Sequence, residues 1–139
     1  MRGRSFVRRR DAAVIAVFLA TEIGLAELAG IRYDPDDPGR SNLDLWQREI
    51  TVCGKGGKPR IVKITYDAAR AVDRYLRVRA RHAQAYRPQL WLGASNRGPM
   101  TASGIYHMIA RRGRQCGVDL YPHRLGHHFS YTWQMKNCI

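Results

Sequence analysis

The sequence predicts an α+β domain that is mainly α, with one small antiparallel β-hairpin or sheet in its middle. Two observations predict this class. Apolar residues recur at the three-to-four spacing of amphipathic helices over four segments. Two short β-branched runs flank a glycine turn between residues 49 and 64. With 139 residues, of which 45% are hydrophobic, the chain is long enough for one domain with its own core.

The first elements are expected to be a basic arm and a buried helix. Residues 1–10 hold five arginines and little apolar content, which favours a disordered basic arm or a linker remnant. From Asp11 to about Ala29 the apolar residues recur at helical spacing, and Asp11 stands at a favoured helix start. The Asp, Pro and Gly content of residues 33–42 then predicts a loop.

The hairpin and three further helices follow. Glu49–Cys53 and Arg60–Ile64 are the predicted strands of the hairpin. An amphipathic helix is expected from Asp67 to about His82, with arginines on its outer face. Thr101 can cap the next helix, and Pro122 can open the last one. The segment Leu90-Trp91-Leu92, between the first two of these helices, is predicted to be buried.

Charge predicts a polyanionic partner. The net charge is +13, and residues 51–139 carry all of this excess, with sixteen basic and three acidic side chains. Such a surplus attracts DNA, RNA or acidic membranes, although an arginine-rich composition is also typical of a GC-rich genome. No apolar run approaches the ~20 residues of a membrane-spanning helix. We therefore expect a cytoplasmic protein whose partner is not the membrane.

Metal ligands and cofactor motifs are not evident. The three cysteines, Cys53, Cys116 and Cys138, include no C-x-x-C pair. His123 and His127 are four residues apart, but no third ligand follows at a useful spacing. The sequence therefore predicts no metal and no small-molecule cofactor.

Three segments, in order, resemble motifs of one enzyme family. Residues Thr21–Ile31 are similar to a T-G-L-R-x-x-E-L-x-x-L box, Gly54–Arg60 to a G-K-G-x-K-x-R hairpin, and Pro122–His127 to a P-H-x-L-R-H box. This order is that of the catalytic domain of tyrosine site-specific recombinases, the phage integrase family. The resemblance implies a partial catalytic domain over residues 11–129, with a divergent tail over 130–139.

The resemblance also implies a chemistry. In the family a tyrosine attacks a DNA phosphate to give a phosphotyrosyl intermediate, two arginines neutralise the phosphate oxygens, and a hairpin lysine protonates the leaving oxygen. No metal is required. By position, Lys55 matches the lysine and His123 the first histidine of the H-x-x-R motif. The implied partner is double-stranded DNA.

This chain departs from the pattern at both arginines. Gly24 and Gly126 stand where the two motifs have arginine. Losing one charge-stabilising donor costs a factor of roughly 10² to 10³ in rate. We also expect the family's nucleophilic tyrosine to lie beyond Ile139, and its N-terminal domain to be missing. Catalysis is therefore expected to be impaired, and whether the chain is an enzyme stays open.

Lys58, Arg60 and the arginine face of the 67–82 helix are candidates for phosphate contact. Glu27 is expected to lack a counterion, and Gly24 to weaken its helix by up to ~1 kcal/mol.

The first functional reading is a DNA-binding family member associated with DNA integration and recombination. The alternatives are a non-enzymatic DNA-binding regulator or competitor, and a recombinase that borrows a tyrosine from another subunit, which the double arginine loss disfavours. Homo-oligomerisation is expected because missing elements would expose apolar surface.

Overall fold

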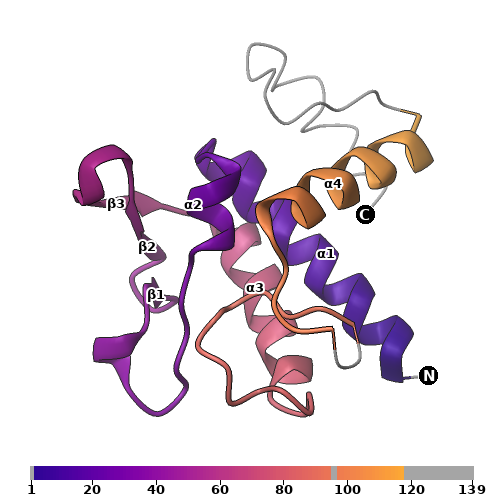
Figure 1. The fold of residues 1–139 in the computed structure, drawn as a ribbon, viewed down its shortest axis with the longest axis horizontal. Coiled ribbons are helices and arrows are strands. Elements are labelled where there is room, and N and C mark those ends of the chain that lie inside the picture. The colour runs from indigo at the N-terminus through magenta and orange to yellow at the C-terminus, as the bar shows by residue number, and fades with distance from the viewer. Residues whose placement is uncertain (1, 95–96, 118–139) are drawn as a thin grey trace.

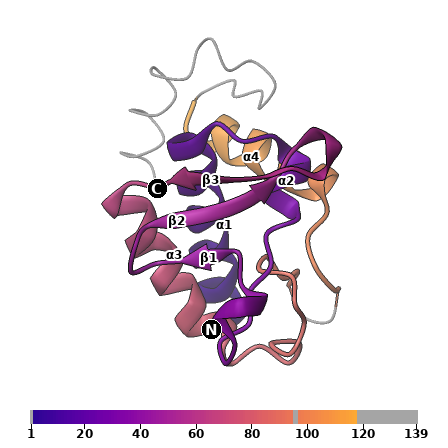
Figure 2. The same cartoon turned by 90° about the vertical axis from the view of Figure 1, so that its left-hand side faces the viewer.

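The computed structural model describes residues 2–94 and 97–117, and their fold is α+β and mainly α, as predicted (Figure 1). A three-stranded antiparallel sheet has the order β1-β2-β3 (Figure 2). Two short 3-10 turns, Pro38–Arg40 and Lys55–Gly57, complete the regular structure of these residues. The helices are α1 (Arg2–Thr21), α2 (Leu25–Ala29), α3 (Tyr66–Arg79) and α4 (Ala102–Gln115), and the strands are β1 (Leu43–Asp44), β2 (Glu49–Cys53) and β3 (Pro59–Lys63).

The helices enclose a single apolar core. α1 packs along α3, the sheet lies to one side of them, and α2 contacts both β2 and α4 (Figures 1 and 2). The predicted burial of Leu90, Trp91 and Leu92 is confirmed, since each is at most 1% exposed. The Trp91 indole N–H donates to the Leu28 carbonyl at 3.0 Å, which ties this segment to α2.

The N-terminal residues form part of the first helix, so the prediction of a disordered basic arm was wrong. α1 begins at Arg2, and Phe6 is only 7% exposed. The Phe6 ring centroid lies 5.6 Å from that of Tyr75 and 4.8 Å from that of His82. A phenylalanine and a buried Arg10, one helical turn apart, give this arginine-rich segment the inward face that its composition concealed.

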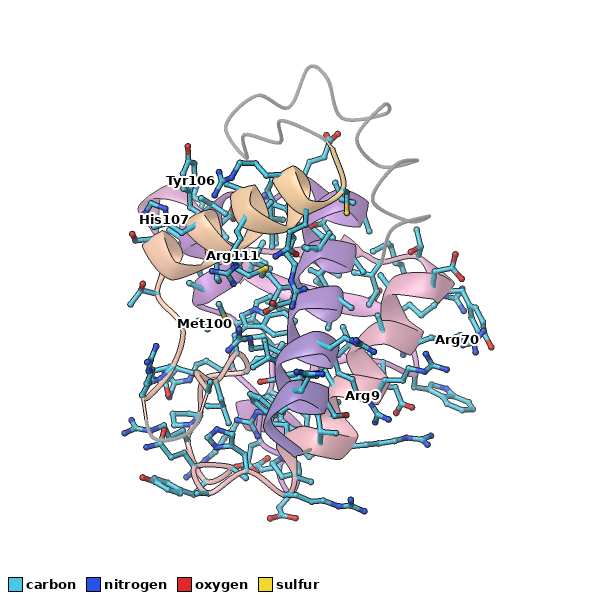
Figure 3. The ribbon with its side chains drawn as sticks, turned by 90° about the vertical axis from the view of Figure 1, so that its right-hand side faces the viewer. Arg9, Arg70, Met100, Tyr106, His107 and Arg111 are labelled. Atoms are coloured by element: carbon cyan, nitrogen blue, oxygen red, sulfur yellow. The ribbon has the colours of Figure 1, made fainter. Side chains whose placement is uncertain are left out.

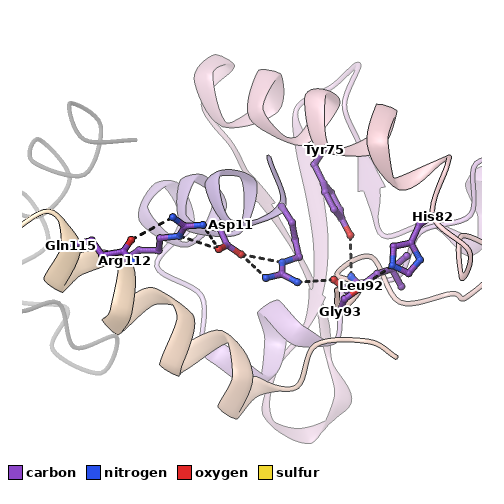
Figure 4. Close-up of polar contacts among 8 residues, drawn as sticks. Asp11, Tyr75, His82, Leu92, Gly93, Arg112 and Gln115 are labelled. Carbon is purple, nitrogen blue, oxygen red and sulfur yellow. Dashed lines mark hydrogen bonds and ion pairs between the residues drawn. The ribbon is translucent and has the colours of Figure 1, made fainter. Parts of the chain in front are cut away.

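A buried carboxylate joins α1 to α4 (Figure 4). Asp11 is 2% exposed, and its Oδ1 accepts hydrogen bonds from Arg10 Nε and Nη2 at 3.0 and 2.8 Å. Its Oδ2 accepts from Arg112 Nε and Nη2 at 3.0 and 2.9 Å. Arg10 also donates to the Leu92 carbonyl at 3.2 Å. Asp11 is therefore an ion-pair centre within a helix, and the prediction that it starts a helix was wrong.

A second buried cation organises the loop after α3. Arg79 is 1% exposed and donates to four main-chain carbonyls at 2.7 to 3.2 Å, those of Ala85, Arg87, Gln89 and Leu90. Its guanidinium also lies over the Tyr33 ring, 5.1 Å from the centroid. The Tyr75 hydroxyl donates to Leu90 O at 2.8 Å, and burial raises the pKa of Tyr75 to about 12. This hydroxyl therefore stays protonated and able to donate at neutral pH.

The predicted 11–29 helix is two helices with a break between them. α1 ends at Thr21, Glu22 adopts a left-handed φ of 56°, and α2 begins only at Leu25. Gly24 is the N-cap of α2, with extended φ and ψ of −66° and 158°. Because Gly24 lies outside both helices, the expected cost of a glycine within a helix does not arise.

The break gives a prediction for Glu22. A non-glycine residue with left-handed φ is strained by roughly 1 kcal/mol, and the T-G-L-R-x-x-E-L box has glycine at this position. We expect Glu22→Gly to raise the free energy of unfolding by about 0.5 to 1 kcal/mol, measured by urea denaturation. Glu22→Ala removes the carboxylate and keeps the Cβ atom. An equal gain in the alanine variant would show that the side chain, rather than the backbone, is responsible.

The hairpin prediction is confirmed. β2 and β3 pair in an antiparallel register that places Ile50 opposite Val62 and Val52 opposite Arg60. The turn uses positive φ at Gly56 (79°), a conformation that glycine adopts without strain. Strand β1, which was not predicted, adds two residues to the edge of the sheet.

The caps of the two later helices are also clear. Thr65 caps α3 by accepting from Ala68 N at 3.1 Å, and Thr101 caps α4, as predicted, by accepting from Gly104 N at 3.0 Å. The predicted helix at Pro122 lies outside the described residues.

Candidate nucleic-acid interface

The first two sequence motifs meet where the start of α2 faces the hairpin. A Cβ atom added at Gly24 would lie 3.6 Å from Glu27 Oε1, and one added at Gly54 would lie 3.6 Å from Glu27 Oε2. The glycine at the arginine position and the first glycine of the hairpin turn therefore flank the same carboxylate. Tertiary packing brings together residues that are thirty positions apart in the chain.

Glu27 has a counterion, so the prediction that it lacks one was wrong. Arg60 Nη1 donates to Glu27 Oε2 at 2.8 Å, and Arg60 Nη2 donates to Oε1 at 3.3 Å. The Gly24 N–H donates to Glu27 Oε1 at 3.1 Å. The Glu27 side chain is 16% exposed and that of Arg60 is 52% exposed. The pair is thus half-sheltered at the junction of α2 and β3.

Strand alternation explains how Arg60 reaches α2. Arg60 pairs with Val52, which is 2% exposed, and side chains of directly opposite residues lie on the same face of a sheet. Arg60 therefore lies on the same face as Val52, and its guanidinium reaches Glu27 while about half of the side chain stays exposed. The sequence contained this signal, since Val62 lies two residues along the same strand. The predicted contact of Arg60 with phosphate stays a prediction, while in this structure its guanidinium binds Glu27.

Glycine at position 54 permits a close approach of the Arg60 guanidinium. A Cβ atom there would lie 3.0 Å from Arg60 Nη1, closer than carbon and nitrogen atoms ordinarily approach. The carbonyl of Lys58 accepts from the Gly54 N–H at 3.3 Å and closes the turn. The side chain at this position is absent so that the guanidinium can lie against the backbone.

The two predicted lysines lie on this turn. Lys55 opens the 3-10 turn directly after Gly54, and Lys58 follows it as an exposed residue. The turn therefore carries two lysines in the segment between Gly54 and Arg60, which both approach Glu27. His123 and Gly126 lie outside the described residues, so their predicted roles stay predictions.

A second basic surface lies along α1 and α3. A groove of about 730 Å³ between these helices has an apolar floor that includes Ile15 and Leu19, and its arginines are Arg8, Arg9, Arg70 and Arg74. Figure 3 labels Arg9 on α1 and Arg70 on α3. Of the predicted arginine face of α3, Arg77 is ion-paired with Asp73 at 3.1 Å.

Within residues 2–94 and 97–117, no three His, Cys, Asp or Glu side chains gather as a metal site would require. None of the helices in that same part of the chain is long and apolar enough to cross a membrane.

Comparison with known proteins places these features in a family. The model of the phage integrase family matches residues 5–136. The chain is 30% identical over 126 residues to tyrosine recombinase XerC of Pseudomonas entomophila and 37% identical over 131 residues to tyrosine recombinase XerC 1 of Ralstonia nicotianae. These alignments cover 90% and 87% of the chain, but only 39% and 40% of the relatives. The chain therefore spans about two fifths of their length.

Solved structures share the fold. The crystal structure of XerA recombinase matches with a TM-score of 0.70 at 23% identity, over 93% of this chain and 47% of that one. The integrase from mycobacterium phage Brujita matches with a TM-score of 0.58 at 20% identity, over 89% of this chain and 40% of that one. These two matches show that the chain shares the fold of the corresponding part of those proteins.

Proposed function

Because the chain belongs to the phage integrase family, we propose that it binds double-stranded DNA as a tyrosine-recombinase homologue associated with DNA integration and recombination. The observation that carries this proposal is the junction of α2 and the hairpin, which holds the two family motifs together and presents a turn with two lysines. The net charge of +13 supports the same partner, because basic surfaces attract the phosphate backbone. A cytoplasmic location stays a prediction.

We further propose that strand cleavage by this chain is impaired. Phosphoryl transfer develops negative charge on the phosphate oxygens, and fixed cations stabilise that charge. Gly24 offers only its backbone at the start of α2, and the neighbouring Arg60 guanidinium is engaged by Glu27. Lys55 keeps the position of the family's general acid, so a proton donor is retained at the turn. The arginine that would neutralise the phosphate oxygens from position 24 is lost.

The same observation favours a second candidate function. A protein that keeps the DNA-facing turn but has glycine in place of the phosphate-binding arginine at position 24 can occupy a recombination site without cutting it. Such a protein would act as a non-enzymatic regulator or competitor. Self-association of the chain, and independence from any cofactor, also stay predictions.

DNA binding by the hairpin turn is tested by titrating a fluorescein-labelled duplex of about 30 base pairs and following anisotropy across several salt concentrations. We expect binding that weakens steeply with salt. Lys58→Ala should weaken it up to tenfold at low salt and reduce the slope of log K against log salt by about one.

Lys63→Ala is the matched control for this titration. Lys63 is on the same hairpin, but Glu49 holds it at 2.8 Å, so removing it should change affinity less than removing Lys58. A folded protein that shows no salt-dependent binding would contradict the proposed function. Equal losses in the two lysine variants would show general attraction by charge rather than contact at the turn.

A further inference from the structure

We propose that Arg60 and Glu27 act as one positioning pair, which holds the lysine-bearing turn of the hairpin against α2, and that Arg60 is not itself a phosphate ligand. The effect on DNA rests on the function proposed above. The structural part of the proposal, a coupling between α2 and the hairpin, does not depend on DNA binding.

One carboxylate connects three parts of the fold. Glu27 receives both terminal nitrogens of Arg60, at 2.8 and 3.3 Å, and the backbone N–H of Gly24 at 3.1 Å. A two-point contact between guanidinium and carboxylate fixes orientation as well as distance. Strand β3, the N-terminus of α2 and the break after α1 are thereby held at one point.

The turn needs such an anchor because its own residues supply little packing. Cβ atoms added at Gly56 and Gly57 would meet no atom within 4 Å, and both residues have positive φ. A glycine-rich turn loses much conformational freedom when it is ordered. Arg60 lies two residues after Lys58, and its guanidinium lies 3.0 Å from the Cβ position of Gly54. The pair therefore sits against the base of the turn that carries Lys55 and Lys58.

Electrostatics argue against direct phosphate binding by Arg60. If Arg60 turned to a phosphate, the Glu27 carboxylate would lose its counterion beside the DNA backbone. Such an unpaired negative charge would repel the phosphate. Kept together, the two charges cancel, and the turn approaches the DNA without an unpaired carboxylate beside it. Arg60 thus contributes to binding through the position of the turn.

The structural part of the proposal is tested by hydrogen exchange of the free protein. We compare Arg60→Gln, Glu27→Gln and the double variant with wild type. We expect each single substitution to speed exchange of the β2 and β3 amides by about five- to tenfold, with α3 amides unchanged as an internal control. The double variant should exchange no faster than either single one, because both remove the same contact. Additive effects, or no effect on the hairpin, would overturn the proposal.

The part of the proposal that concerns DNA is tested by whether Glu27→Gln strengthens or weakens DNA binding. Removal of a negative charge near DNA should tighten binding if Glu27 only repels phosphate. The positioning role predicts the opposite, a loss by the same factor of about three to ten as for Arg60→Gln, with Arg60→Lys retaining part of the affinity through a single ion pair. Tighter binding by Glu27→Gln, together with a salt slope lowered by about one in Arg60→Gln, would make Arg60 a phosphate ligand and overturn the proposal.

The hydrogen-exchange and DNA-binding experiments distinguish failure of this proposal from failure of the proposed function. If wild type binds no DNA, the proposed function fails, and hydrogen exchange still decides whether the pair couples α2 to the hairpin.

Discussion

Replacing Asp11 by alanine is expected to lower the free energy of unfolding by about 3 to 5 kcal/mol, the range found when one partner of a buried ion pair is removed. Asp11 is 2% exposed and accepts four hydrogen bonds from two guanidinium groups. Without it, Arg10, whose side chain is 8% exposed, keeps a buried charge whose one remaining partner among the described residues is the Leu92 carbonyl. Arg112 is 29% exposed and can turn to solvent, so most of the cost arises at Arg10.

Urea denaturation followed by circular dichroism measures this loss, and Asp73→Ala is the matched control. Asp73 forms an ion pair with Arg77 on the surface of α3, where the side chains are 51% and 74% exposed. Its removal should cost less than about 0.5 kcal/mol. A loss below 1 kcal/mol for Asp11→Ala would mean that water or a rearranged side chain replaces the carboxylate. An Asp11→Asn variant, which keeps the shape, should fall between wild type and alanine.

Arg79→Met is expected to destabilise the fold by about 3 kcal/mol or more, because it leaves several buried acceptors without donors. The four carbonyls that Arg79 binds belong to the loop between α3 and the buried segment at Leu90. Among the described residues, no ion pair joins the Arg79 guanidinium to an acid. Burial accordingly lowers the pKa of Arg79. Methionine fills similar volume and supplies none of the hydrogen bonds.

Thermal unfolding and hydrogen exchange measure the effect of Arg79→Met. Amides of residues 82–92 should exchange faster in Arg79→Met than in wild type, since this loop depends on the guanidinium. Arg77→Met is the control, because Arg77 is on the same helix and exposed, and its loss should shift stability by less than about 0.5 kcal/mol. An intact loop in Arg79→Met would show that Tyr75 and backbone contacts suffice to hold it.

Local signals predicted much of the fold. The hairpin followed from two β-branched runs around glycines, and the cap of α4 from Thr101, because these features depend on residues that are neighbours in the chain. The start of α1 was missed because five arginines masked the inward positions of Phe6 and Arg10. The break after Thr21 was missed because apolar spacing continues across it.

The buried charges were beyond local reasoning. Asp11 and Arg112 are separated by 101 positions, and nothing near either one indicates the other. The candidate site was likewise predictable only in part. The motifs located Gly24, Lys55 and Lys58, while the contact between Glu27 and Arg60 arises only when α2 packs on the sheet. Strand alternation is a local signal for the orientation of Arg60, because it places this residue on the same face of β3 as Val62.

The link from Asp11 to Arg112 bears on how the polypeptide is made. A ribosome adds about 5 to 20 residues per second, so roughly 5 to 20 s separate the synthesis of these two residues. During that interval the nascent α1 has its carboxylate and its apolar face but not the helix that completes their burial. Translation speed and chaperone access over this stretch should therefore influence the yield of folded protein more than the length of the chain suggests.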